Sequence, residues 1–204
     1  MNIRENYEVI IEKHPHSESL NKKLMGDIKD FYFYSPEQNG KYTNVRATQY
    51  NVKSDEKTKS MYLIENWVKS LLERSTSDFL SSPREHDARI NINMWFAKYN
   101  KGEYTLKHSH MNYALYAFVY FVNSPKGSAP LVFETTGTKI RPEEGKVIIF
   151  PSIMRHGVPK NNCKDRLTLV GDMVSSRVKE PSSDFMPGSS SYPKRGHYTV
   201  NLPL

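Results

Sequence analysis

The chain has 204 residues, of which 37% are hydrophobic and 25% are charged, and its formal net charge is +7 at pH 7. This length and composition fit one domain with a hydrophobic core, and they exclude collagen, coiled coils and wholly disordered chains. The longest apolar and aromatic run, residues 113–122, has ten residues, about half of what a membrane-spanning helix needs.

The charged residues and the single cysteine restrict partners and location only broadly. Lysines and arginines are dispersed, with no run of five like charges, so nucleic acid is neither favoured nor excluded as a partner. Cys163 is the only cysteine, which excludes an internal disulfide and favours a reducing compartment. The N-terminal stretch interleaves Arg4 and three glutamates with apolar residues, a pattern that is not typical of a secretory signal. We therefore expect a cytoplasmic protein without membrane association.

Helical periodicity dominates the N-terminal part of the sequence. A short strand is predicted for residues 7–12, and Leu20, Leu24 and Ile28 then predict a helix that begins near Ser17. Residues 35–55, which include the turn-forming stretch SPEQNG, are predicted to form loop and short extended pieces. The apolar pattern of residues 57–74 predicts an amphipathic helix, which we interpret as a support that packs on the rest of the domain.

From residue 89 the apolar residues follow the alternating period of β-strands. Residues 89–99 alternate in this way, and further strands are predicted for residues 114–123, 129–134, 146–150 and 167–174. Glycine, proline and asparagine turns separate these runs, and many short strands between such turns favour a sandwich or barrel. The last 30 residues contain seven serines, four prolines and two glycines, so we expect them to lack regular structure.

Three histidines in the strand-rich half are candidate metal ligands. His108 and His110 are two residues apart, so both imidazoles project from the same face of an extended segment. This spacing alone is weak evidence, since His14 and His16 repeat it elsewhere. His156 follows the predicted strand of residues 146–150, where it could complete a set of three ligands that leaves coordination positions open.

A candidate anion-binding pair follows His156 in the sequence. Arg166 stands at the start of the last predicted strand, and its planar guanidinium suits a carboxylate, which it can bind through two parallel hydrogen bonds. Thr168, two residues further on, would point the same way and offer a hydroxyl group to the same anion. The order of these residues predicts a metal site with an anion site beside it.

These motifs together resemble the 2-oxoglutarate/Fe(II)-dependent oxygenases, in particular the prolyl-hydroxylase-like and phage-borne members. The resemblance rests on His108-Ser109-His110, on FPSIMRHGV with His156, and on Arg166-Leu167-Thr168, and it covers roughly residues 90–174. It implies a double-stranded β-helix, or jelly roll, with Fe(II) at its mouth. It also implies oxidative decarboxylation of 2-oxoglutarate to succinate and CO2, coupled to hydroxylation of a substrate C–H bond by O2.

The resemblance assigns the metal ligands residue by residue. His108 and His156 match the two histidine ligands of the family, while His110 stands where most members have an aspartate or glutamate. We rank ligation by three histidines first. The alternative is that His110 does not bind the metal, which leaves two histidines and a water, with Asp87 or Glu103 as nearby acids that could reach the site.

The resemblance also assigns the residues that hold 2-oxoglutarate. Arg166 matches the arginine that pairs with the far carboxylate of this co-substrate, with Thr168 beside it. Tyr120 and Tyr99 match tyrosines that contact the co-substrate in relatives. Aromatic filling of the hydrophobic core is an equally good interpretation of both tyrosines.

The sequence therefore predicts one mainly β oxygenase domain, a jelly roll flanked by N-terminal helices. We expect helical support in residues 1–85, the catalytic core in residues 86–178 and a C-terminal tail rich in serine, proline and glycine in residues 179–204. The expected cofactors are Fe(II) and 2-oxoglutarate, and the expected substrate is a peptide, such as a prolyl or other peptidyl residue, or a small molecule. If the gene is carried by a phage, the expected location is the host cytoplasm. The alternatives are a three-histidine dioxygenase that does not use 2-oxoglutarate and a jelly-roll binding module without catalysis.

Overall fold

The computed structural model describes residues 7–34, 43–48, 52–53, 55–75 and 90–175. Within these residues there are two helices, α1 (Ser17–Asp27) and α2 (Lys59–Ser75), a short 3-10 helix, η1 (Ile28–Asp30), and ten strands. The strands are β1 (Ile10–Lys13), β2 (Arg46–Ala47), β3 (Ile90–Tyr99), β4 (Thr105–His108), β5 (Tyr116–Asn123), β6 (Leu131–Phe133), β7 (Lys139–Ile140), β8 (Lys146–Pro151), β9 (His156–Val158) and β10 (Arg166–Ser175).

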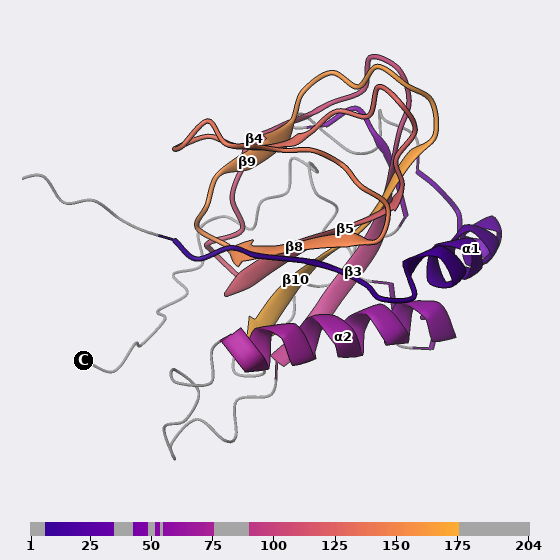
Figure 1. Cartoon of the computed structure of the whole chain (residues 1–204), viewed down its shortest axis with the longest axis horizontal. Coiled ribbons are helices and arrows are strands. Elements are labelled where there is room, and N and C mark those ends of the chain that lie inside the picture. The colour runs from indigo at the N-terminus through magenta and orange to yellow at the C-terminus, as the bar shows by residue number, and fades with distance from the viewer. Residues whose placement is uncertain (1–6, 35–42, 49–51, 54, 76–89, 176–204) are drawn as a thin grey trace, which may run out of the picture.

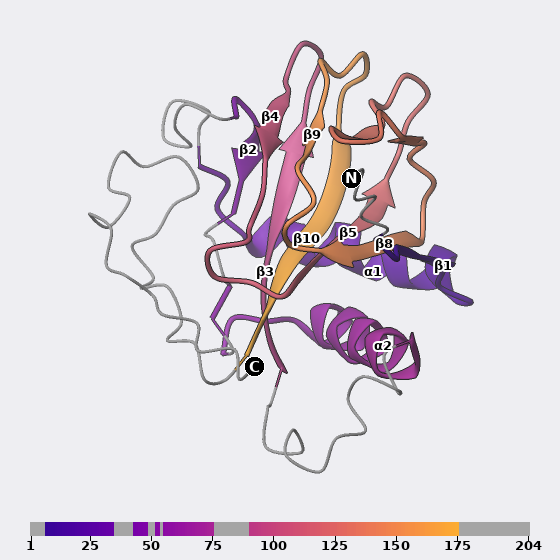
Figure 2. The same ribbon diagram turned by 90° about the vertical axis from the view of Figure 1, so that its left-hand side faces the viewer.

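The described strands form two antiparallel sheets that face each other. The larger sheet has the order β1-β8-β5-β10-β3-β2, and the smaller has the order β4-β9-β6-β7. Figure 1 shows β4 and β9 of the smaller sheet on one side of the larger sheet and helix α2 on the other side. Figure 2 shows the molecule from the side, with helix α2 below β8 and β5. This arrangement confirms the predicted jelly roll with helical support.

Side chains alternate between the two faces of the central strands, and the buried apolar residues therefore form two hydrophobic cores. Leu167, Leu169 and Met173 of β10 pack with α1 and α2 in one core. The intervening side chains face the smaller sheet, where a second core includes Phe121 and Phe133. Because neighbouring residues of a strand point to opposite faces, the polar residues that lie between the leucines of β10 are directed into the space between the sheets.

The predicted elements agree closely with the structure where it describes them. The two helices begin within two residues of the predicted starts, and each of the six predicted strands overlaps a strand of the structure. Strands β4, β7 and β9 were not predicted as separate strands, because segments of two to four residues carry too little alternation to recognise. Most of the predicted 35–55 loop, and the 179–204 tail, lie outside the described residues. Among the described helices, none is both long and apolar enough to span a membrane.

Candidate functional site

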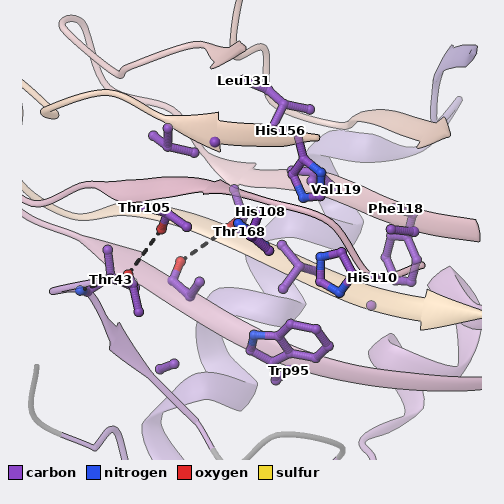
Figure 3. A pocket seen from close by; sticks show the side chains of 18 of the residues that line it. Thr43, Trp95, Thr105, His108, His110, Phe118, Val119, Leu131, His156 and Thr168 are labelled. Carbon is purple, nitrogen blue, oxygen red and sulfur yellow. Dashed lines mark hydrogen bonds between the residues drawn. The ribbon is translucent and has the colours of Figure 1, made fainter. Parts of the chain in front are cut away.

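Strands β4 and β9 bring the three candidate histidines together at one end of the space between the sheets. His108 ends β4 and lies opposite His156, which begins β9, while His110 follows in the turn after β4. One nitrogen of each ring lies within 4.8 Å of one nitrogen of each of the others. Figure 3 shows the three rings around the same cavity. The predicted convergence of these histidines is therefore present in the fold.

Hydrogen bonds to the backbone hold the rings of His108 and His156 with Nδ1 directed away from the histidine cluster. The Nδ1 atom of His108 lies 2.8 Å from the carbonyl oxygen of Leu106, and Nδ1 of His156 lies 2.9 Å from that of Met154. Since a carbonyl oxygen only accepts hydrogen bonds, each Nδ1 carries the proton and donates it. The Nε2 atoms of both neutral rings therefore keep a lone pair, which is the form in which imidazole binds a metal.

Burial and mutual proximity keep these rings uncharged. Burial and the neighbouring His110 lower the pKa of His108 to about 4, although Asp172 and a backbone hydrogen bond oppose that shift. Burial, followed by the effect of His108, lowers the pKa of His156 well below its ordinary value. At neutral pH both are thus ready to bind a metal without first losing a proton.

Arg166 lies fully inside the protein, with an exposed fraction of 1%. None of its three side-chain nitrogens makes a hydrogen bond to any residue that the structure describes. Its guanidinium group instead lies over the ring of Tyr99, 4.4 Å from the centroid, and 5.5 Å from that of Phe121. Burial lowers the pKa of Arg166, but a guanidinium group remains charged in proteins. A buried cation without an acceptor is expected to bind an anion.

One cavity of about 160 Å³ connects the histidine cluster with Arg166. A row of hydroxyl groups lines it. Thr105 Oγ1 lies 3.1 Å from Thr43 Oγ1 (Figure 3) and 2.9 Å from the Tyr99 hydroxyl. Thr168 also lines the cavity and donates a 3.3 Å hydrogen bond to the carbonyl oxygen of Ala97. Much of the remaining wall is apolar. Such a cavity suits a small molecule with an anionic end.

The structure does not place Tyr120 at the cavity. Its side chain lies in the hydrophobic core beneath the larger sheet, where the hydroxyl donates a 2.6 Å hydrogen bond to Asn21 of α1. The neighbouring residue Val119 lines the cavity instead. The strand was correctly predicted, but its side chains alternate between the two faces, and the similarity in sequence did not fix which face Tyr120 occupies. Core filling, the other interpretation, is correct for this residue.

The acids proposed as alternative ligands do not join the described cluster. Glu103 accepts a 2.6 Å hydrogen bond from the backbone of Asn100 in the turn before β4, and it is not part of the histidine group. Asp87 lies outside the described residues. Sequence reasoning instead missed Asp172, which is buried on β10 with Oδ1 3.0 Å from His110 Nδ1. The sequence did hold a signal for this position. Asp172 lies an even number of residues after Arg166 and Thr168 on the same predicted strand, so all three side chains face the same side.

Sequence comparison finds no relatives, since no family model matches the chain and no curated protein matches it. Comparison with solved structures finds proteins of similar fold. A prolyl-4-hydroxylase of Pseudomonas putida is 14% identical, with a TM-score of 0.63 over 82% of this chain and 92% of that chain. A 2OG-Fe(II) oxygenase family oxidoreductase of Burkholderia pseudomallei is 12% identical, with a TM-score of 0.59 over 81% of this chain and 84% of that chain. HygX of Streptomyces hygroscopicus, solved with nickel and 2-oxoglutarate, is 7% identical, with a TM-score of 0.58 over 82% of this chain and 83% of that chain. At these identities the likeness establishes the fold, so the chain has the jelly-roll fold of 2-oxoglutarate/Fe(II) oxygenases.

Proposed function

We propose that this protein is an Fe(II)- and 2-oxoglutarate-dependent dioxygenase that hydroxylates its substrate and releases succinate and CO2. The observation that carries the proposal is the fully buried Arg166, which has no hydrogen-bond partner in the described part of the chain and shares a cavity with three clustered histidines. A metal-binding jelly roll that does not use 2-oxoglutarate has no need for a buried cation at this place.

The residues of the site fit the two cofactors. His108 and His156 present unprotonated Nε2 atoms, and His110 completes the group. Imidazole is a common ligand of Fe(II), and three ligands on one side leave positions open for a chelating co-substrate. HygX, which shares the fold, was solved with nickel and 2-oxoglutarate bound, and this supports the same pair of ligands here.

The protein's own residues would bind, orient and shield the co-substrate. Arg166 would hold the far carboxylate through two charge-assisted hydrogen bonds, with Tyr99 beneath its guanidinium group and Thr168 adjacent along β10. The apolar walls would keep water from this ion pair, which strengthens it. Bound iron would supply the redox chemistry that couples decarboxylation of 2-oxoglutarate to insertion of oxygen into a C–H bond.

We infer that the acceptor is a prolyl or other peptidyl residue. This inference is supported by the shared fold with the Pseudomonas putida prolyl-4-hydroxylase, although one fold serves many substrates. Prolyl peptides are therefore the first acceptors to test. We also infer a cytoplasmic location, which the single cysteine supports.

Anaerobic titration of the Fe(II)-loaded protein with 2-oxoglutarate tests the proposal. Chelation of Fe(II) by the keto acid is expected to produce a weak visible charge-transfer band that saturates with one equivalent. Succinate should lack this effect, since it carries both carboxylates but no keto group. Binding of iron without any band would favour the three-histidine dioxygenase that does not use 2-oxoglutarate. Absence of metal binding would favour a jelly-roll binding module.

A further inference from the structure

The metal site has an unusual charge if only its three ligands are counted. Three neutral imidazoles leave the full charge of a divalent ion uncompensated, whereas the usual set for this fold includes one carboxylate. We propose that Asp172 is a positioning residue that supplies the missing negative charge through His110. This inference rests on the proposed function and adds a further residue to the same site.

The geometry places Asp172 directly behind His110. Its side chain is 0% exposed, it lines the cavity, and its Oδ1 atom lies 3.0 Å from His110 Nδ1. A carboxylate on Nδ1 leaves Nε2, at the opposite side of the ring, directed to the metal. Asp172 itself does not belong to the group of ligand atoms that the described residues form. It therefore acts on the metal through the imidazole ring.

This position follows from the alternation of β10. Arg166, Thr168 and Asp172 are separated by even numbers of residues, so all three face the space between the sheets. Strand β10 lies between β3 and β5 in the larger sheet, where Asp172 is paired with Asn93 of β3 and with Ala117 of β5. The carboxylate of Asp172 is thus anchored on a central strand, next to the imidazole of His110 in the turn after β4.

The chemistry of a carboxylate bound to a metal-ligating imidazole supports the proposal. Such a carboxylate fixes which nitrogen carries the proton and makes the other nitrogen a stronger donor. Its charge acts over a short distance in a buried, weakly polar environment. The Nδ1 atom of His110 forms its hydrogen bond with the Tyr113 hydroxyl, 2.5 Å away, which carries no charge, whereas Asp172 contributes its charge at 3.0 Å.

The substitution Asp172→Asn removes the charge and keeps the shape of the side chain. Asparagine leaves a polar group of nearly the same size 3.0 Å from Nδ1, but without the negative charge. Fe(II) affinity, measured anaerobically by competition with a coloured chelator, is expected to fall about 10- to 100-fold. The Fe(III)/Fe(II) potential is expected to rise, because loss of a nearby anion destabilises Fe(III) more than Fe(II). Asp172→Ala should weaken iron binding further.

The matched control is Glu65→Gln. Glu65 is a buried acid of α2 that accepts hydrogen bonds from Lys57 and Lys69, and it belongs to the opposite side of the larger sheet. The same change from carboxylate to amide there is expected to lower the melting temperature and to leave iron affinity and potential unchanged. Equal iron affinity and potential in wild type and Asp172→Asn would overturn the proposal. A wild-type protein that binds no iron would instead refute the proposed function and this inference with it.

A second pair of variants tests the sign of the effect. In a His110→Asp background the new ligand supplies the charge itself, and the carboxylate of Asp172 becomes a repulsive neighbour. Adding Asp172→Asn in that background is therefore expected to strengthen iron binding, opposite to its effect in wild type. The same direction in both backgrounds would refute the charge argument. Failure of both Asp172→Asn proteins to fold would assign Asp172 a structural role and overturn the proposal.

Discussion

Replacement of Arg166 by methionine is expected to have opposite effects on co-substrate binding and on stability. Methionine keeps much of the apolar stem that packs on Tyr99 and Phe121, but it removes the charge and all five donors. Two charge-assisted hydrogen bonds are each worth about 1.5–3 kcal/mol. At about 1.4 kcal/mol per decade, loss of both should weaken 2-oxoglutarate binding by roughly two to four decades.

The same substitution should stabilise the protein in the absence of co-substrate. Arg166 is buried without a hydrogen-bond partner among the described residues, and replacing buried charges by apolar side chains often stabilises proteins by about 1–4 kcal/mol. The melting temperature of the protein without 2-oxoglutarate should therefore rise. Lysine at this position should restore only part of the affinity, because an ammonium group keeps the charge but lacks the planar pair of donors.

Calorimetric titration of 2-oxoglutarate into metal-loaded wild type and Arg166→Met measures the first effect, and thermal unfolding measures the second. Arg141→Met is the control, because Arg141 is exposed and does not line the cavity; it should change neither quantity. Iron affinity should be nearly equal in all three proteins, because neither arginine is a proposed ligand. Equal dissociation constants for 2-oxoglutarate in wild type and Arg166→Met would refute the co-substrate assignment and favour the three-histidine dioxygenase.

Two further predictions concern the histidine cluster, and a third concerns Tyr120 in the hydrophobic core. His156→Ala should lose most bound metal, measured by elemental analysis after desalting, and unchanged metal content would contradict the ligand assignment. The protein without metal should become less stable as pH falls from 6.5 towards 4, because the unfolded chain then binds a proton at His108 that the folded protein, with its pKa of about 4, does not. The slope from this residue is about 1.4 kcal/mol per pH unit, His156 acts in the same direction, and denaturant unfolding at several pH values should show this loss. Tyr120→Phe should lower stability by about 1–3 kcal/mol, since it leaves Asn21 Oδ1 without its 2.6 Å hydrogen bond; its affinity for 2-oxoglutarate, measured by calorimetry, should equal that of wild type.

Clear alternation in the long strands was sufficient to predict a β-sandwich or barrel, and the resemblance to the oxygenase family implied the jelly roll. The ten residues of β3 and the ten of β10 alternate between two environments, and they pair along their whole lengths. The histidine cluster was predictable for a related reason. A spacing of two residues in an extended segment fixes the relative direction of His108 and His110 whatever the rest of the fold does.

The errors arose where a role depended on contacts between distant elements. Tyr120 and Val119 are neighbours in the sequence, and only the packing of α1 and α2 decides that Tyr120 faces the helices. The hydroxyl row could not be predicted, since Thr43 and Thr105 come from segments about 60 residues apart that meet in an isolated β-bridge. Such contacts depend on tertiary structure and leave no periodic trace in the sequence.

The distribution of charge along β10 bears on the order in which a metal ion and a dianion bind in the cavity. The cation Arg166 begins the strand and the anion Asp172 stands six residues later on the same face, a separation of about 20 Å along the backbone. Whichever end of a dicarboxylate enters the cavity, its carboxylate is attracted by Arg166 and repelled by Asp172. The end that approaches the histidine cluster is therefore acceptable only if a metal ion offsets this repulsion. Metal binding before co-substrate binding is the order that this polarity favours.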